Sequence, residues 1–210
     1  MTTRKTILTP FARLSFPNLF TAKANEQGTM LYSCVLLFPK DFDAAGKRLG
    51  LAPSLIAEAH TAFKAMKALA AETALELYGG KDKVPPGIRQ QDLGKSSGWP
   101  FRDQGQREYD GYEEGAVFIS ISSKQKPTVL DRNKNQIMDE ADIYPGCWVR
   151  ASISAYGYKA KGNTGISFGL GNVQKLCDDD SLTGRGRAQD EFTAIDGAEG
   201  SSESAESLFD

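Results

Sequence analysis

The sequence contains one histidine, His60, and three widely spaced cysteines, Cys34, Cys147 and Cys177. Zinc sites and Ser-His-Asp triads need clusters of these residue types, and no such cluster or motif surrounds His60. An odd number of cysteines without a CxxC pair is typical of reduced thiols in a cytosolic protein. We therefore expect no metal site, no cofactor and no catalytic residue of these kinds.

Signatures of nucleotide-dependent enzymes and of membrane proteins are also missing. There is no GxxxxGK[ST] loop, and the glycines at 165, 169 and 171 lie inside a strand pattern, not between a strand and a helix. No apolar run reaches the roughly 18 residues of a membrane-spanning helix, and the first residues have no apolar stretch of a signal peptide. The acidic run 138–142 would suit a metal-dependent nuclease, although an exposed turn explains it more simply. We expect a protein that is not an enzyme.

Charge is distributed unevenly along the 210 residues. The sequence has 25 basic and 27 acidic residues; seven of the acidic ones and none of the basic ones lie in 189–210, which leaves 25 basic against 20 acidic residues in 1–188. A basic body with an acidic tail is typical of proteins that bind nucleic acid and of interaction tails. A surplus of five charges over 188 residues is also ordinary, so charge alone does not decide.

Alternation of apolar and polar residues at period two predicts strands in 116–123, 147–159 and 164–175. In 147–159 one face is small and aliphatic, which suits a core. The other face carries aromatic and basic side chains: Trp148, Arg150, Tyr156 and Tyr158, followed by Lys159 and Lys161. Rings interleaved with cations suit single-stranded nucleic acid, because bases stack on the rings and phosphates meet the cations.

The rest of the chain completes a mainly β pattern with one helix. Apolar residues at helical spacing predict a helix over 54–78, with Ser54 as its N-cap and Gly79 ending it. Strands are expected at 4–20 and 29–38 and in a hairpin at 129–138, without a βαβ rhythm. We therefore predict a small β-barrel of the OB (oligonucleotide/oligosaccharide-binding) type with an inserted helix.

The segment 80–114 has no sustained period, and a loop of this length inside a domain is usually functional or disordered. Its aromatic residues argue against simple disorder. The second group of DNA-binding candidates comes from this loop and from the end of the strand 116–123: Trp99, Phe101, Arg102, Lys124 and Lys126. For Trp99, Phe101 and Trp148 a place in the core is an open alternative.

Three segments resemble a family of tailed-phage proteins: ISSKQKPTVLDRN, YPGCWVRASISAYGY and GISFGLGNVQKL, followed by a Gly-Arg-Gly-Arg-Ala stretch and an acidic end. That family, long of unknown function, is regarded as phage single-stranded DNA-binding proteins with an OB fold. The resemblance implies a non-catalytic replication or recombination protein in the cytoplasm of an infected bacterial host. It implies single-stranded DNA as the partner.

The residues from about 189 to 210 are small, acidic and serine-rich, which predicts a disordered tail after a single domain over 1–188. The last residues, Leu208, Phe209 and Asp210, place two large apolar side chains at the end of an acidic run. We expect them to dock on a phage or host replication protein, with a mere solubility tail as the alternative. Related bacterial tails end in Pro-Phe, so the partner is not carried over from them.

Two other functions fit the same residues. An RNA-binding module has the same aromatic and basic needs, because nothing here identifies a contact to a 2′-hydroxyl. A virion structural or assembly protein would pack the aromatic face against another subunit. The sequence leaves open whether the protein is a monomer or a dimer.

Overall fold

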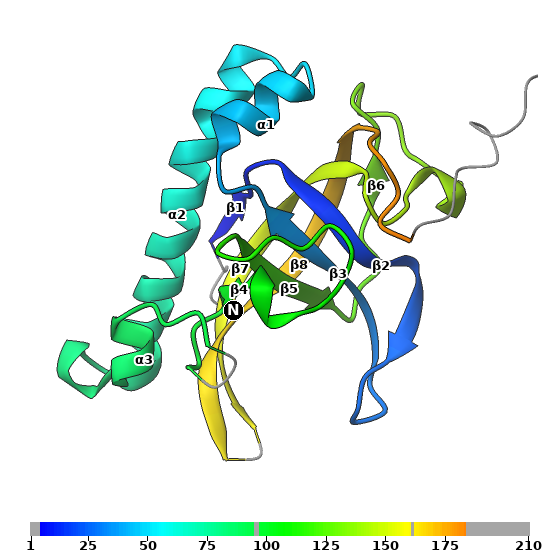
Figure 1. Ribbon diagram of the computed structural model, residues 1–210. Helices are drawn as coiled ribbons and strands as arrows, with labels where there is room; N and C mark the ends of the chain where they lie inside the picture. Colours follow the sequence, from blue (N-terminus) through cyan, green and yellow to red (C-terminus); the bar gives the residue numbers. More distant parts are fainter. Residues whose placement is uncertain (1–4, 95–96, 161, 184–210) are drawn as a thin grey trace, which may run out of the picture.

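The computed structural model describes residues 5–94, 97–160 and 162–183, and Figure 1 shows how its elements are arranged. Five strands form a closed barrel: β2 (Ala12–Ala24), β3 (Met30–Phe38), β5 (Val117–Ser123), β7 (Trp148–Ala160) and β8 (Asn163–Cys177). β2 pairs with β3, β3 with β5, β7 with β8 and β7 with β2, all antiparallel. The parallel pair β5–β8 completes the ring. A five-stranded barrel of this kind is the predicted OB-type architecture.

Three short strands extend the barrel. β1 (Thr6–Leu8) pairs with β7, β4 (Arg102–Asp103) with β5, and β6 (Val129–Leu130) with β8. The single strand expected over 4–20 is therefore two strands, because the chain between Leu8 and Ala12, which contains Pro10, leaves the sheet. The hairpin expected at 129–138 is reduced to one bridge between Leu130 and Gln136.

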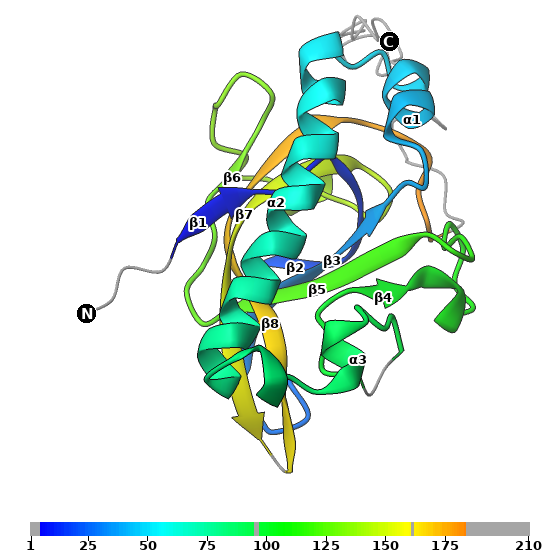
Figure 2. The same cartoon turned by 90° about the vertical axis from the view of Figure 1, so that its left-hand side faces the viewer.

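The helix α2 (Pro53–Tyr78) confirms the predicted helix, and it lies along the barrel against β7, β8 and β1 (Figure 2). Its N-cap is Ala52 with Pro53 at the first helical position, so the prediction of Ser54 as the cap was wrong. Residues at spacings of three to four bury one face against the barrel: Ile56, Ala59, Met66, Leu69, Ala70 and Ala74. Gly79 ends the helix in the left-handed conformation, as predicted.

A further helix, α1 (Phe42–Arg48), was not predicted, because seven residues give too short a pattern. Asp41 caps it by accepting hydrogen bonds from the backbone of Asp43 and Ala44. The segment 80–114 holds short elements: η1 (Lys81–Lys83), α3 (Pro86–Arg89), β4 and η2 (Gln104–Gln106). One more short helix, η3 (Glu140–Asp142), forms at the acidic run 138–142.

The described residues form two hydrophobic clusters, one inside the barrel and one on part of its outer surface. The main core fills the barrel and extends to α2, with Leu36, Ile119 and Phe168 among its fully buried side chains. A small second cluster on the outer face joins Val35, Leu37 and Phe118. The mainly β fold with one long helix is thus as predicted. No helix within the described ranges is long and apolar enough to cross a membrane.

Candidate nucleic-acid interface

Beside the small outer cluster, the outer face of β3, β5 and β8 carries several small polar residues. Ser33 of β3 lies opposite Ser122 of β5, and Ser122 lies opposite Gly169 of β8. In the next row Ser120 is exposed, and Ser167 lies opposite Tyr156 of β7. We call Ser33, Ser120, Ser122, Ser167 and Gly169 together the serine floor. Because their side chains are short or absent, a flat ligand can approach the sheet closely.

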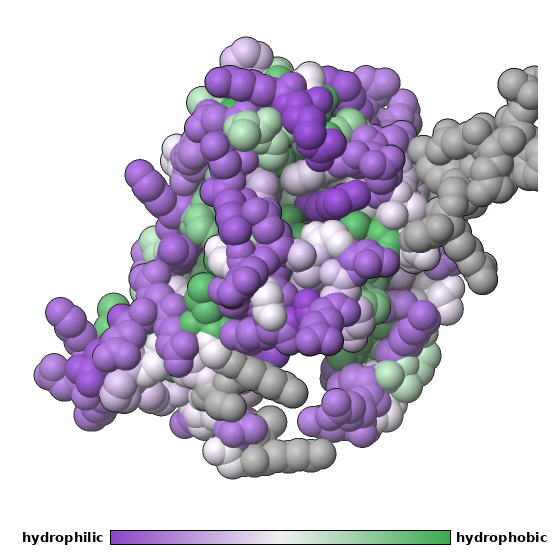
Figure 3. Space-filling model, in the orientation of Figure 1, coloured by the Kyte–Doolittle hydropathy of each residue, from purple (hydrophilic) through white to green (hydrophobic). Residues whose placement is uncertain are grey.

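Two hairpins border this floor. The turn between β2 and β3 and the turn between β7 and β8 project from the same end of the barrel in both ribbon views (Figures 1 and 2). The space-filling view shows a notch in the outline between the two hairpins (Figure 3). In OB folds the corresponding strand face and hairpin loops bind oligonucleotides and oligosaccharides.

Two tyrosines stand at the β7–β8 side of the floor. Tyr156 and Tyr158 line a cavity of about 220 Å³ together with Arg102 and the serines at 120 and 167. The structure thus brings together four of the predicted binding residues: Tyr156 and Tyr158 of β7, Arg102 of β4, and Trp99 from the loop before β4. Stacking surfaces beside a guanidinium and two hydroxyls suit a nucleotide, because every base offers a ring face.

Glycine at position 165 leaves room for the Tyr158 side chain beside the neighbouring strand. Gly165 is opposite Tyr158 in the β7–β8 ladder. A Cβ added at Gly165 would lie 2.9 Å from the Tyr158 hydroxyl oxygen and 2.7 Å from the carbonyl oxygen of Gly98. A larger residue at position 165 would therefore displace the Tyr158 ring or the backbone of the loop at Gly98. The shape of this cavity thus depends on glycine, which has no side chain, at position 165.

Trp148, predicted to stack on bases, is instead a core residue with only 4% of its surface exposed. Its ring packs on Phe11 with ring centroids 5.8 Å apart. Its indole Nε1 donates a hydrogen bond of 2.7 Å to the Asp179 carboxylate. The β7–β8 register shifts between Trp148 and Val149, so strict alternation breaks at this residue. We withdraw Trp148 as a stacking residue.

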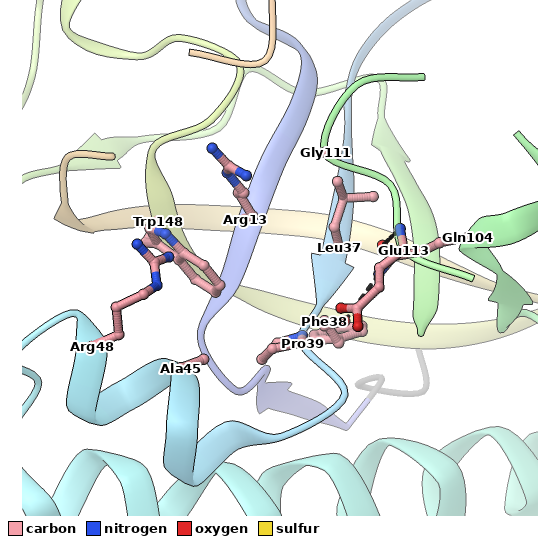
Figure 4. Close-up of a pocket in the computed structure, with 10 residues that line it drawn as sticks. All are labelled: Arg13, Leu37, Phe38, Pro39, Ala45, Arg48, Gln104, Gly111, Glu113 and Trp148. Atoms are coloured by element: carbon pink, nitrogen blue, oxygen red, sulfur yellow. Dashed lines mark hydrogen bonds between the residues drawn. The ribbon is translucent and has the colours of Figure 1, made fainter. Parts of the chain in front are cut away.

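Asp179 holds the chain that follows β8 against this end of the barrel. Arg48 donates two hydrogen bonds to its carboxylate, at 3.2 and 2.6 Å. Figure 4 shows the Arg48 guanidinium beside Trp148, in a cavity that Arg13 also lines. Partial burial raises the pKa of the Asp179 carboxyl, but the hydrogen bonds from Arg48 and Trp148 outweigh it and hold the pKa well below its ordinary value. The carboxylate therefore stays ionised, and the charge of Arg48 is neutralised from within the chain.

Trp99 and Phe101 are also buried, so both take the place in the core that the sequence left open as an alternative. Phe101 packs edge-on against Phe63 of α2 and Phe168 of β8, with centroids 5.7 and 5.5 Å apart. Trp99 packs on Phe101 at 5.5 Å and forms part of the wall of the Tyr156–Tyr158 cavity. These rings fix the loop to the core, so they support the site from below.

Arg150 is engaged by other side chains. Its Nε donates to the Gln174 side chain at 2.9 Å, and its Nη1 lies 3.8 Å from a carboxylate oxygen of Glu58 on α2. Arg150 lies six positions before Tyr156 on β7, about 20 Å of extended strand. Arg150 therefore belongs to the packing between α2 and the barrel, and the prediction that it joins Tyr156 in one site is not supported.

The predicted lysines are exposed where the structure describes them. Lys159 follows Tyr158 near the tip of the β7–β8 hairpin, and Lys124 and Lys126 follow β5. The Lys126 ammonium lies 5.9 Å from the centroid of the Phe20 ring on β2. Lys161 and the three tail residues Leu208, Phe209 and Asp210 lie outside the described residues. Among those that are described, no group of His, Cys, Asp and Glu side chains could hold a metal ion.

Sequence reasoning missed the serine floor. Ser33, Ser120, Ser122 and Ser167 are uninformative one by one, because serine is common on any exposed strand face. Only the pairing of β3, β5 and β8 places them side by side. A run such as Ser120, Ser122 and Ser123 in one strand was the available signal.

A family model described as the single-stranded DNA-binding protein of Enterobacter phage Enc34 matches residues 5–204. A curated relative, putative protein p50 of Acyrthosiphon pisum secondary endosymbiont phage 1, is 32% identical over 190 residues, which cover 89% of this chain and 92% of the relative.

Solved structures share the fold. The Enc34 protein in complex with single-stranded DNA has a TM-score of 0.57 at 24% identity, over 84% of this chain and 89% of that chain. The gp2.5 single-stranded DNA-binding protein of bacteriophage T7 has a TM-score of 0.51 at 14% identity, over 93% and 98%. With the family match extending over nearly the whole sequence, this chain belongs to the family of phage single-stranded DNA-binding proteins typified by that of Enterobacter phage Enc34.

Proposed function

We propose that the protein binds single-stranded DNA without sequence preference, on the outer face of β3, β5 and β8. The observation that carries this proposal is the cavity where Tyr156, Tyr158 and Arg102 meet above a floor of serines. Family membership and the DNA-bound Enc34 structure of the same fold support it. No covalent step is involved: binding itself is the activity.

Each kind of side chain on this face has a distinct task in that binding. The two tyrosine rings offer stacking surfaces, which accept any base because every base has a ring face. Arg102 and the exposed cations Lys124, Lys126 and Lys159 balance the charge of the phosphates. The serine hydroxyls both donate and accept hydrogen bonds, so they satisfy base edges without choosing among them.

Single strands are preferred over duplex by the same geometry. A stacked and paired base in a duplex hides its faces, so the rings of Tyr156 and Tyr158 have nothing to stack on. A single strand exposes each base at a much lower cost. The cations alone would bind both forms, so the rings provide the discrimination.

The wider role is to cover single strands during phage replication and recombination, in the cytoplasm of the infected bacterial host. In this proposal residues 1–188 form the DNA-binding domain, and the acidic tail 189–210 recruits phage or host replication proteins through Leu208, Phe209 and Asp210. The sequence motivates this division, because all seven tail charges are negative and two large apolar residues stand at the tail's end.

Titration of the purified protein with labelled single-stranded DNA, duplex DNA and RNA tests the binding. We expect the tightest binding to single-stranded DNA. Affinity should fall as salt rises, with a logarithmic slope of about −0.7 per phosphate neutralised, or roughly −3 for four cations. Lys126→Gln should reduce the slope by about one such contact, whereas Lys64→Gln on the exposed side of α2 should leave it unchanged.

The same titration separates the rival functions. Equal or tighter binding of RNA would favour an RNA-binding module. Binding of none of the three at moderate salt, together with self-assembly, would favour a virion structural protein. Equal affinity for duplex and single strands would remove the role given to the tyrosine rings.

Truncation after Ala188 tests the tail. A tethered anion acts at an effective concentration on the order of millimolar, so the tail should compete with DNA for the cations of the binding face. We expect the truncated protein to bind single strands more tightly, with a gain that shrinks as salt rises. A chain shortened by only 208–210 keeps most of the charge, so it should retain the competition and lose partner recruitment. Unchanged affinity at all salt concentrations would show that the tail takes no part in binding.

A further inference from the structure

Two large aromatic side chains are exposed together on the outer face, on the β2 side of the serine floor. Phe16 on β2 is 47% exposed and Tyr109 in the loop after β4 is 54% exposed. Their ring centroids lie 5.3 Å apart with the planes at 69°. Exposed aromatic residues are common singly, but two that meet at the surface form a patch whose water contact is unfavourable.

The backbone at Phe16 is strained in a way that displays its ring. Its φ of +46° falls in the left-handed region, which an aromatic residue rarely adopts. β2 advances three residues, from Ser15 to Asn18, while its partner β3 advances two, from Val35 to Ser33, so Phe16 lies in a bulge. Bulges re-aim side chains beside functional sites, and such strain persists only where the surroundings hold it.

The loop that carries Tyr109 is anchored to the barrel. Gln104 is buried and donates hydrogen bonds of 2.9 Å to the carbonyl oxygens of Phe38 and Val117. Its side-chain oxygen accepts from the Glu113 backbone at 3.0 Å, the dashed contact in Figure 4. Tyr112 packs on Tyr109 at 5.5 Å and on Phe118 at 6.0 Å. These contacts restrict the position of the Tyr109 ring.

The exposed pair borders a cavity of about 370 Å³ that Ser15, Tyr112 and Pro145 also line. Its remaining walls include the carboxylates Glu108 and Asp110 on either side of Tyr109. Carboxylates repel phosphates, so this site does not suit the backbone of a nucleic acid. An uncharged planar ring that stacks on Phe16 or Tyr109 suits it well.

The pair also lies in line with the floor already described. Asn18, two residues from Phe16, lies opposite Ser33 and its amide is 3.4 Å from the Ser33 hydroxyl. From Ser33 the row continues through Ser122 to Gly169. The pair Phe16–Tyr109 and the pair Tyr156–Tyr158 thus stand at opposite ends of one small-residue floor that crosses the strands.

We propose that Phe16 and Tyr109 form a second nucleobase-stacking site, so that a single strand crosses β3, β5 and β8 with bases held at both ends. This inference rests on the proposed function, since it concerns the same ligand. The strand's phosphates point away from Glu108 and Asp110, and a base stacks on the exposed surface of the Phe16 or the Tyr109 ring. The strained bulge at Phe16 keeps the site preformed in the absence of DNA.

Titration of the full chain with labelled oligothymidylate and with an abasic oligonucleotide of the same length tests this site. Phe16→Leu and Tyr109→Leu keep apolar volume and remove the rings. Each is expected to lower the affinity for oligothymidylate about fivefold to a hundredfold, with the abasic strand unaffected. The slope of affinity against salt should stay unchanged because no phosphate contact is lost. Tyr109→Phe keeps the ring and should bind like the parent, as should Met138→Ala, an exposed apolar residue in the segment 131–142.

Photo-cross-linking of the unmodified protein to iodouracil-substituted strands gives a second measurement that does not depend on how a variant folds. Cross-links at Phe16 or Tyr109 are expected beside those at Tyr156 or Tyr158. A protein that binds single strands but shows unchanged affinity in both leucine variants would overturn this inference and leave the proposed function intact. Variants that alter only the oligomeric state would also overturn it and would mark the pair as a contact between copies. A parent protein that binds no single strand would refute the proposed function itself.

Discussion

Replacing Tyr156 and Tyr158 together by alanine is expected to weaken single-stranded DNA binding by at least about 2 kcal/mol, roughly thirtyfold. Each ring that stacks on a base contributes about 1–3 kcal/mol, and both rings line the same cavity. The loss should appear in the dissociation rate, because the electrostatic encounter with the strand is unaltered. Filter binding or fluorescence anisotropy measures the change.

The matched control keeps the rings and removes the hydroxyls. Tyr156→Phe with Tyr158→Phe should bind within a few fold of the parent, because stacking depends on the ring face. The alanine variant must also remain folded. Both tyrosines are only partly buried on the outer face, so a small loss in free energy of unfolding is expected. Unchanged DNA affinity in a folded double-alanine variant would move the binding site away from this cavity.

Local patterns predicted the elements that depend on local rules. The helix 53–78 follows from apolar residues at helical spacing and from Gly79, and the strands β5, β7 and β8 follow from alternation. Tyr156 and Tyr158 were correctly placed on the outer face by the same alternation. The prediction of a mainly β fold with an inserted helix needed only these elements and their order along the chain.

The sequence did not predict which residues from other parts of the chain cover the outer face of a strand. Alternation placed Trp148 opposite the aliphatic face of β7, and that placement suggested exposure. In the folded chain the residues Arg48 and Asp179, 100 and 31 positions away in sequence, close over its ring. Such contacts depend on the complete topology, so an aromatic residue at a polar position of a strand remains ambiguous from sequence alone.

The exposed ring of Phe16 illustrates the opposite error. A strand was expected only as far as residue 20, yet β2 continues to Ala24 through a bulge at Phe16. A left-handed φ at an aromatic residue has no sequence signature, because propensity alone would place glycine or asparagine there. Strained positions are the ones that sequence rules miss and that binding sites use.

Replacing Trp148 by alanine is expected to lower the free energy of unfolding by about 3–5 kcal/mol, because a buried ring packed on Phe11 is removed. Part of this cost is the partner left behind: Asp179 loses the indole hydrogen bond and keeps those from Arg48 and from the backbone of Asp180. Urea unfolding of the variant and the parent gives the difference. DNA affinity of the folded fraction should not change, since Trp148 does not line the Tyr156–Tyr158 cavity.

Trp148→Phe separates packing from hydrogen bonding in this position. The phenyl ring retains much of the contact with Phe11, whereas the donor to Asp179 is lost, so the expected destabilisation is about 1.5–3 kcal/mol. A folded alanine variant with stability close to the parent and with weakened DNA binding would restore Trp148 as a stacking residue. The stability of the barrel end and the affinity of the binding face are thus expected to vary independently, because one depends on the contacts of Trp148 and the other on rings about 20 Å or more along β7.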